Sequence, residues 1–328
     1  MLIQKQALDY QLAIELMQEF KAKNIEVLIY HKRIPASFKE TFREEFLFNK
    51  RVLAISIWQR REFQTCKPSA HYQLPLVSGC PGLCEYCYLN TNLGRRPYIK
   101  VYVNTNDILS KAEEYIWQRE PEETIFEGAA TSDPVAVESW TGSLKKTVEF
   151  FSNFNNARFR FVTKYTDIGG LLDIEHRKRT QVRFSINCES VIERFERGAP
   201  KLHLRLQAAS KVMGAEYPLG FLIGPIFAFE GWREEYEELL QTLKDYLPSD
   251  NITFELITHR FTTRAKKIIE EVYPETEVPL DEKTRRFKYG QFGYGKYIYD
   301  DKVMLELKDF FTERIKEIFP QSRILYFV

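Results

Sequence analysis

Short apolar runs alternate with longer amphipathic stretches through the middle of this chain, and this alternation most constrains its fold. It is typical of βα units, whose strands form a parallel sheet. Several runs are apolar on both faces, as buried parallel strands are. We predict strands over residues 73–77, 99–103, 124–127, 159–163, 182–186, 220–223 and 252–257. The fold class is therefore α/β, a partial TIM-like (β/α)6 barrel with reactive groups at the carboxyl ends of its strands.

Two of the intervening helices have clear signals. Apolar residues recur at helical spacing from Trp232 to Leu247, and Pro248 follows directly. A second helix is predicted from Ser143, with Leu144 and Val148 on one side.

A chain of 328 residues is long enough for one large domain or two ordinary ones. No Pro-, Gly- or Ser-rich linker interrupts its middle, so we predict an N-terminal extension over 1–70, the barrel over 71–260 and a C-terminal region over 261–328. In that last region, glycines alternate with Phe and Tyr in RRFKYGQFGYGKYIY. This pattern predicts a β-hairpin with a Gly-rich turn.

Three cysteines, Cys80, Cys84 and Cys87, lie within eight residues in SGCPGLCEYCYLN, just after a predicted strand. Three thiols are too few for a closed zinc site and an odd number for disulfides. Held by three thiolates, a [4Fe-4S] cluster has one open iron, which a ligand with an amino and a carboxylate group can chelate. A zinc site that recruits a distant ligand and a group of inert buried thiols are the alternatives.

The N-terminus lacks a signal-peptide pattern, and no apolar run is long enough to span a membrane. We therefore expect a cytoplasmic protein without a membrane partner. A net charge of +1 gives no general argument for nucleic acid. Lys and Arg do gather in RFRFVTK, EHRKRT, HRFTTRAKK and KTRRFKYG, so one face can be basic, whereas an even spread of solvated charges is the alternative.

The spacing C-x-x-x-C-x-x-C followed by an aromatic residue resembles the radical S-adenosylmethionine superfamily. The resemblance implies that the open iron binds S-adenosylmethionine and that the resulting 5′-deoxyadenosyl radical takes a hydrogen from the substrate. The cofactor then supplies the difficult chemistry, and the protein supplies placement and exclusion of water.

Further blocks are similar to the signature blocks of the spore photoproduct lyase family, in the family's order and from about Leu74 onward. They read GCPGLCEYCYLNTNLG, FEGAATSDPVAVE, FVTKYTDIGGLL, RFSIN, GPIFAFEGWREEYEELL, ITHRFTTRAKKIIEEVYPET and RRFKYGQFGYGKYIYDD. The resemblance implies a carbon–carbon lyase that repairs 5-thyminyl-5,6-dihydrothymine, an ultraviolet lesion of spore DNA, to two thymines. It implies double-stranded DNA with this lesion as partner, an external electron donor such as ferredoxin or flavodoxin, and the spore core as location. We expect a monomer, although the sequence leaves the oligomeric state open.

The resemblance also assigns roles to residues. It makes Cys80, Cys84 and Cys87 the cluster ligands. It places Tyr86 and Tyr88 near the path of the radical. It makes four residues contacts to S-adenosylmethionine: Ser132, Lys164, Ser185 and Asn187. Alternatively, Tyr88 is a core residue and Lys164 pairs with a surface acid.

Ala130 departs from the family pattern, because Bacillus-type members carry there the cysteine that returns a hydrogen to the product. Cys66 is the preferred replacement and Cys188 the second choice. The alternative for either thiol is a small buried apolar group. Ala130 also keeps open a related radical enzyme acting on another nucleic-acid substrate. A zinc-dependent nucleic-acid-binding module without catalysis is the third interpretation.

The hairpin departs from the pattern as well, because Gln291 and Phe292 stand where Bacillus-type members have Arg-Tyr. Phe292 is predicted to act as an apolar wedge beside the lesion. The predicted phosphate contacts are Arg285, Arg286, Lys288 and Lys296. A purely structural ribbon is the alternative.

Overall fold

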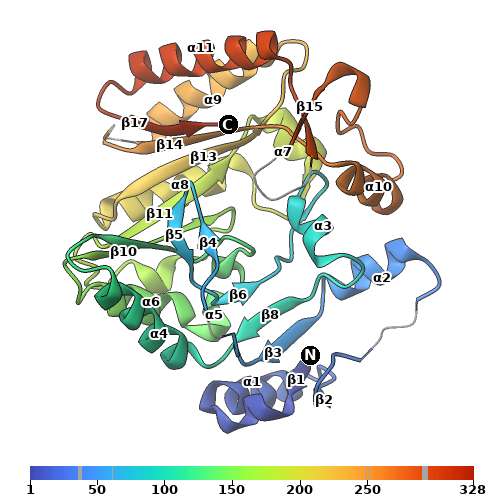
Figure 1. Ribbon diagram of the computed structural model, residues 1–328, viewed down its shortest axis with the longest axis vertical. Helices are drawn as coiled ribbons and strands as arrows, with labels where there is room; N and C mark the ends of the chain where they lie inside the picture. The colour runs from blue at the N-terminus through green and yellow to red at the C-terminus, as the bar shows by residue number, and fades with distance from the viewer. Residues whose placement is uncertain (36–38, 61, 248, 250, 290–294) are drawn as a thin grey trace. The chain divides into compact units, whose positions relative to one another are not determined.

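The structure, a computed structural model, describes residues 1–35, 39–60, 62–247, 249, 251–289 and 295–328 (Figure 1). Its contacts divide the chain into two compact units, one of residues 1–81 and 93–181 and the other of residues 82–92 and 182–328. The chain passes between the units at three places, after Pro81, after Asn92 and after Gln181. The predicted division at residues 70 and 260 is a different one and stays a prediction.

The first unit contains a five-stranded sheet in which only the β6–β8 pairing is antiparallel. Its order is β2 (Leu28–Tyr30), β1 (Leu2–Gln4), β3 (Leu53–Ser56), β8 (Ile99–Tyr102) and β6 (Val77–Ser78). The unit's N-terminal helices are α1 (Gln11–Ala22) and α2 (Phe42–Asn49). Helix α2 begins with a capping box, in which Thr41 and Glu44 each bind the other's backbone N–H.

The first unit also contributes four neighbouring strands, β10 (Ala157–Thr163), β9 (Thr124–Glu127), β5 (Ala70–Gln73) and β4 (Thr65–Cys66). β10, β9 and β5 are parallel, whereas β4 runs antiparallel to β5. Helices α4 (Thr105–Gln118) and α6 (Ser143–Phe151) lie side by side along these strands (Figure 1). Stacked Phe151 and Phe159 join α6 to β10 in a fully buried aromatic core.

The second unit contributes the parallel strands β11 (Thr180–Ile186), β13 (Leu219–Ile226), β14 (Thr253–Thr258) and β17 (Arg323–Phe327). Helices α9 (Trp232–Tyr246) and α11 (Asp301–Ile318) pack on them (Figure 1), and Arg314 of α11 forms an ion pair of 2.5 Å with Glu237 of α9. The other α-helices and strands complete the two units. They are α3 (Tyr88–Leu93), α5 (Glu138–Thr141), α7 (Glu189–Phe195), α8 (Leu202–Gly214), α10 (Thr263–Val272), β7 (Leu83–Cys84), β12 (Glu196–Arg197), β15 (Arg286–Tyr289) and β16 (Gly295–Ile298).

Most predicted elements are confirmed. Six of the seven predicted strands correspond to β8, β9, β10, β11, β13 and β14, and the predicted helices to α6 and α9. The strand predicted over 73–77 is wrong, because β5 ends at Gln73 and β6 begins at Val77. Pro75 lies between them and has no N–H to donate to a ladder. Helix α9 ends at Tyr246, and Pro248 lies outside the described residues.

Strands β1 to β3 were not predicted, since each spans only three or four residues of the N-terminal region. The predicted hairpin is confirmed as the antiparallel pair β15–β16. In the described part of the chain, no helix combines the length and the apolar character that a membrane crossing requires.

Candidate active site

The cysteine segment begins at a turn that requires glycine. Gly79 has φ of +86°, and a Cβ there would lie 2.2 Å from the carbonyl oxygen of Tyr98. Its N–H donates to the carbonyl of Thr131 at 2.8 Å, and Gly79 forms a parallel bridge with Ser132. The start of the cysteine segment is therefore fastened to the segment that carries Ser132.

Ser132 fits a ligand contact. Its residue is buried, and its Oγ has no hydrogen-bond partner among the described residues. A buried hydroxyl without a hydrogen-bond partner destabilises the folded protein. A polar group of a ligand that bonds to it would remove this cost.

Asp133 joins this segment to the end of β10. Its carboxylate accepts from Thr163 Oγ1 at 2.7 Å and from the Lys164 N–H at 2.8 Å. Burial raises the pKa of Asp133 to about 6, and the bonds from Lys164 and Thr163 oppose this rise. The structure thus brings Ser132 and Lys164, both predicted to contact S-adenosylmethionine, to neighbouring strand ends.

Lys50 was not predicted as part of the site. It is 2% exposed, and its Nζ donates to the Cys80 carbonyl at 3.0 Å. A buried ammonium on the backbone of a predicted thiolate ligand would support a negatively charged cluster held by Cys80.

In the second unit, the segment with Cys84 and Cys87 is held by its backbone. Cys84 pairs with Glu196 in the β7–β12 ribbon, and the Cys87 N–H donates to the Cys84 carbonyl at 3.2 Å. Tyr273 donates to the Leu83 carbonyl at 3.2 Å. Burial chiefly, and then Cys84 and Cys87, raise the pKa of Tyr273, so its phenol lies near both sulfurs.

None of Cys80, Cys84 and Cys87 is in a disulfide. Each can therefore supply one thiolate, and a [4Fe-4S] cluster takes one thiolate on each iron that the protein binds.

Tyr86 is part of a buried polar network. Its hydroxyl donates to Glu196, and Arg205 forms an ion pair with the same carboxylate at 2.5 Å. Arg205 also donates to the Ser185 carbonyl at 3.0 Å. Burial and Glu196 raise the pKa of Tyr86 well above its ordinary value, so the phenol keeps its proton. Tyr88, in contrast, is 58% exposed and is not a core residue.

Asn187 and Cys188, at the end of β11, are engaged within the protein. The Asn187 amide donates to the Pro225 carbonyl at 2.8 Å and accepts from the Tyr236 hydroxyl at 3.0 Å. Burial raises the pKa of the Cys188 thiol to about 12. Cys66, by comparison, is partly exposed, and it lies two residues from Gln64, which lines a cavity with Ala130.

Cationic and aromatic side chains alternate along the first strand of the hairpin. Phe287 and Tyr289 alternate with Arg286 and Lys288 along β15, and the side chains of this strand are exposed. A Cβ on Gly295 would lie 2.0 Å from the Phe287 ring, so this glycine makes room for it. The wedge predicted at Phe292 lies outside the described residues.

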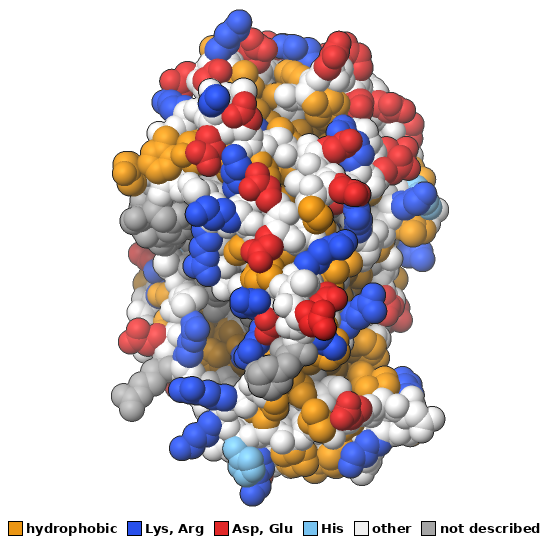
Figure 2. All heavy atoms as spheres, turned by 90° about the vertical axis from the view of Figure 1, so that its right-hand side faces the viewer, with side chains coloured by type: hydrophobic (Ala, Val, Ile, Leu, Met, Phe, Trp, Pro, Cys, Tyr) orange, Lys and Arg blue, Asp and Glu red, His pale blue; other side chains and the backbone are white. Residues whose placement is uncertain are grey.

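Arg285, one of the predicted phosphate contacts, binds groups within the protein. Its guanidinium donates to the His259 carbonyl at 3.0 Å and lies 3.6 Å from the centre of the Tyr299 ring. Lys288 and Lys296 lie directly opposite each other in the register of the hairpin. Figure 2 shows many Lys and Arg side chains across the middle of the face it presents, with fewer Asp and Glu among them.

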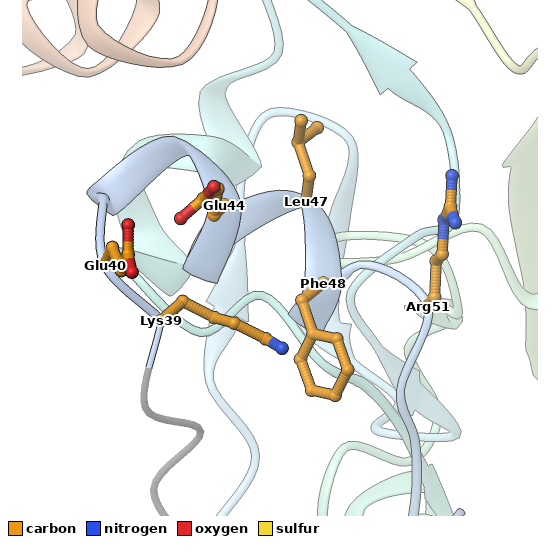
Figure 3. A pocket seen from close by; sticks show the side chains of 6 residues that line it. All are labelled: Lys39, Glu40, Glu44, Leu47, Phe48 and Arg51. Carbon is orange, nitrogen blue, oxygen red and sulfur yellow. The ribbon is translucent and has the colours of Figure 1, made fainter.

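A hollow of about 600 Å³ over α2 contains none of the predicted site residues (Figure 3). Lys39 points toward Phe48 there, with Nζ 4.5 Å from the ring centre. Its other lining residues are Glu40, Glu44, Leu47 and Arg51. Mixed charges at an exposed helix are an ordinary surface arrangement.

Comparison with known proteins gives one consistent result. The family model described as spore photoproduct lyase matches residues 1–328. The spore photoproduct lyase of Clostridium acetobutylicum is 46% identical over 100% of this chain and 98% of its own length. The spore photoproduct lyase of Bacillus subtilis is 42% identical over 99% of this chain and 96% of its own length.

Solved structures agree. A spore photoproduct lyase complexed with dinucleoside spore photoproduct has a TM-score of 0.97 and 43% identity, over 100% of this chain and 98% of its own. A double mutant, with one cysteine changed to alanine and one serine changed to cysteine, has bound AdoMet and dinucleoside spore photoproduct. It has a TM-score of 0.97 and 44% identity over the same shares. These likenesses confirm the predicted partial barrel.

Proposed function

The chain belongs to the spore photoproduct lyase family, and from this premise we propose that it performs the family's repair reaction with the residues described above. It is a radical S-adenosylmethionine lyase of DNA repair that converts 5-thyminyl-5,6-dihydrothymine to two thymines, using S-adenosylmethionine and a [4Fe-4S] cluster. The match over the whole chain is the observation that carries this function.

When bound, the cluster and S-adenosylmethionine supply the radical that takes a hydrogen from the lesion. The residues of this chain bind and orient. Cys80, Cys84 and Cys87 would hold the cluster. The Ser132 hydroxyl, which has no hydrogen-bond partner among the described residues, would bind S-adenosylmethionine together with Lys164 and Ser185. Asn187, whose amide also donates to the Pro225 carbonyl, is proposed as a further contact to S-adenosylmethionine. Tyr86, held by Glu196, and exposed Tyr88 flank the last thiolate.

The function is tested by anaerobic reconstitution with iron and sulfide, followed by S-adenosylmethionine, a reductant and the thymine dimer. Release of thymine supports the repair reaction. 5′-Deoxyadenosine without thymine would instead indicate another nucleic-acid substrate.

Cys66 is proposed as the group that returns a hydrogen to the product. The solved double mutant combines the loss of one cysteine with the gain of another, and this chain has the same kind of exchange at Ala130 and Cys66. We expect Cys66→Ala to keep consuming the lesion while thymine falls to a minor product. The measurement is thymine formed per lesion consumed, by chromatography.

Cys188→Ala is the matched control, because Cys188 is a buried thiol whose sulfur contacts Asn187 and Ser190 within the protein. It should retain the thymine yield. An unchanged yield in Cys66→Ala, or a loss in Cys188→Ala alone, would contradict the assignment.

The hairpin is proposed to contact the backbone of damaged DNA through Arg286, Lys288 and Lys296, with Phe287 and Tyr289 as exposed aromatic groups. Like charges directly opposite in an antiparallel pair are destabilising, and a phosphate between Lys288 and Lys296 would relieve this repulsion. Arg285 then supports the hairpin through its contacts with His259 and Tyr299.

Replacing Lys288 and Lys296 together by Gln should weaken binding of a damaged duplex. The slope of log K against log salt should fall by about 0.9 for each phosphate that the variant no longer neutralises. Turnover of the dinucleoside lesion should be unchanged, since it has no duplex to bind. A control double variant, Lys308→Gln/Lys316→Gln on α11, should keep the slope. An unchanged slope in the hairpin variant would exclude the contact.

Other proposals follow from the family alone. They are an external electron donor such as ferredoxin or flavodoxin, a monomer, duplex DNA as the physiological substrate and the spore core as location. The relatives include a protein of Bacillus subtilis, a spore-former.

A further inference from the structure

The first unit has a cavity of about 140 Å³ beside Ala130. Its walls include three aromatic residues, Trp58, Phe63 and Tyr102. Pockets that enclose a whole small-molecule ligand usually measure about 300–1,000 Å³. This cavity can therefore receive one part of a lesion, such as a single base, and its aromatic wall suits stacking.

One cation lines this cavity, and a second lies on a strand that contributes to its wall. Arg60 lines it. Lys100 lies two residues before Tyr102 on β8, so both side chains are on the same face of that strand. Burial and the charge of Arg60 lower the pKa of Lys100, which indicates that the two cations repel each other.

Acidic side chains do not neutralise this pair. Across the described ranges of the chain, neither Arg60 nor Lys100 forms an ion pair, although Glu62 also lines the cavity. Two neighbouring cations without a bound carboxylate favour an anion from outside the chain.

The two residues that precede Arg60 are anchored to neighbouring segments. The buried Asn104 amide binds the Trp58 backbone twice, accepting from its N–H at 2.8 Å and donating to its carbonyl at 3.0 Å. Gln59 donates to Gln6 Oε1 at 3.1 Å. Such anchoring at both backbone groups is what a positioned binding residue requires.

We propose that Arg60 and Lys100 bind the phosphate that joins the two thymidines of the lesion, with the adjoining base in the cavity beside Ala130. This inference rests on the proposed function and names a further subsite of it. The solved relatives hold a dinucleoside, which by its chemistry carries no internucleoside phosphate. Arginine and lysine are both suited to phosphate, the first by paired hydrogen bonds and the second as a point charge.

Equilibrium binding of two probes tests the subsite: the dinucleoside spore photoproduct and the same lesion with its internucleoside phosphate. Wild-type protein should bind the phosphate-bearing probe more tightly. Arg60→Gln/Lys100→Gln should lose this preference, on the order of tenfold for each cation removed, while its affinity for the dinucleoside is unchanged. Arg60→Gln alone, a change at an exposed side chain, should lose part of it and retain the wild-type thermal transition. Lys21→Gln/Lys146→Gln, which removes two exposed lysines elsewhere in the unit, should keep it in full.

The inference is overturned if wild-type protein has no preference for the phosphate-bearing probe. It is also overturned if folded Arg60→Gln and the double variant both keep the wild-type preference. Wild-type turnover of the dinucleoside is measured separately, and its failure would count against the proposed function alone.

Discussion

Arg205→Met should destabilise the protein by about 3–5 kcal/mol, the usual cost of leaving a buried charge without its partner. Arg205 is fully buried, and its guanidinium binds the Glu196 carboxylate and the carbonyls of Ser185 and Pro200. Removing it leaves Glu196, which is 2% exposed, as an uncompensated carboxylate. The measurement is urea unfolding. At an unchanged m-value, the shift of the midpoint gives the change in the free energy of unfolding.

Two variants complete this experiment. Arg205→Met/Glu196→Leu should recover part of the loss, since the unpaired charge is gone while the Tyr86 hydroxyl still lacks its acceptor. Arg194→Met breaks the exposed pair with Glu277 and should cost less than about 1 kcal/mol. Equal losses in Arg205→Met and Arg194→Met would show that burial of the first pair has no energetic consequence.

Cys84→Ala is the second change for which we expect a large effect. It should abolish the retention of a full cluster and lower thymine release by far more than the roughly 10- to 100-fold typical of losing a group that only supports a metal ligand. The β7–β12 pairing uses the backbone of Cys84, so alanine should leave the fold intact. Iron and sulfide content, visible absorption and thymine release are the measurements.

Cys188→Ala serves again as the control and should retain iron. A Cys84→Ala protein with wild-type iron content and activity would remove Cys84 from the ligand set. Loss of iron without any change in the unfolding transition would separate cluster binding from folding.

Local patterns made much of the fold predictable. Strand β13 is a continuous run without charged or amide side chains, and α9 repeats its apolar residues at helical spacing. The spacing of Cys80, Cys84 and Cys87 likewise predicts a cluster, because the three thiols are close together in the sequence. Strand β17 escaped prediction: its five residues lie at the end of the chain and are only partly buried.

The support of the site was not predictable in the same way. Tyr86 and Glu196 are 110 residues apart, and Lys50 and Cys80 are 30 apart. Nothing in the local sequence of EYCY or FERG shows that these groups meet, because tertiary packing brings them together.

The hairpin has a consequence for the protein when no DNA is bound. Phe287 and Tyr289 are 45% and 77% exposed on a strand that presents its side chains to water. Apolar, flat strands of this kind can pair with a second molecule, and lysines on them oppose such pairing. Lys288 and Lys296 would therefore keep stored protein from self-associating through its hairpins, so that neutralising them should promote aggregation as well as weaken DNA binding.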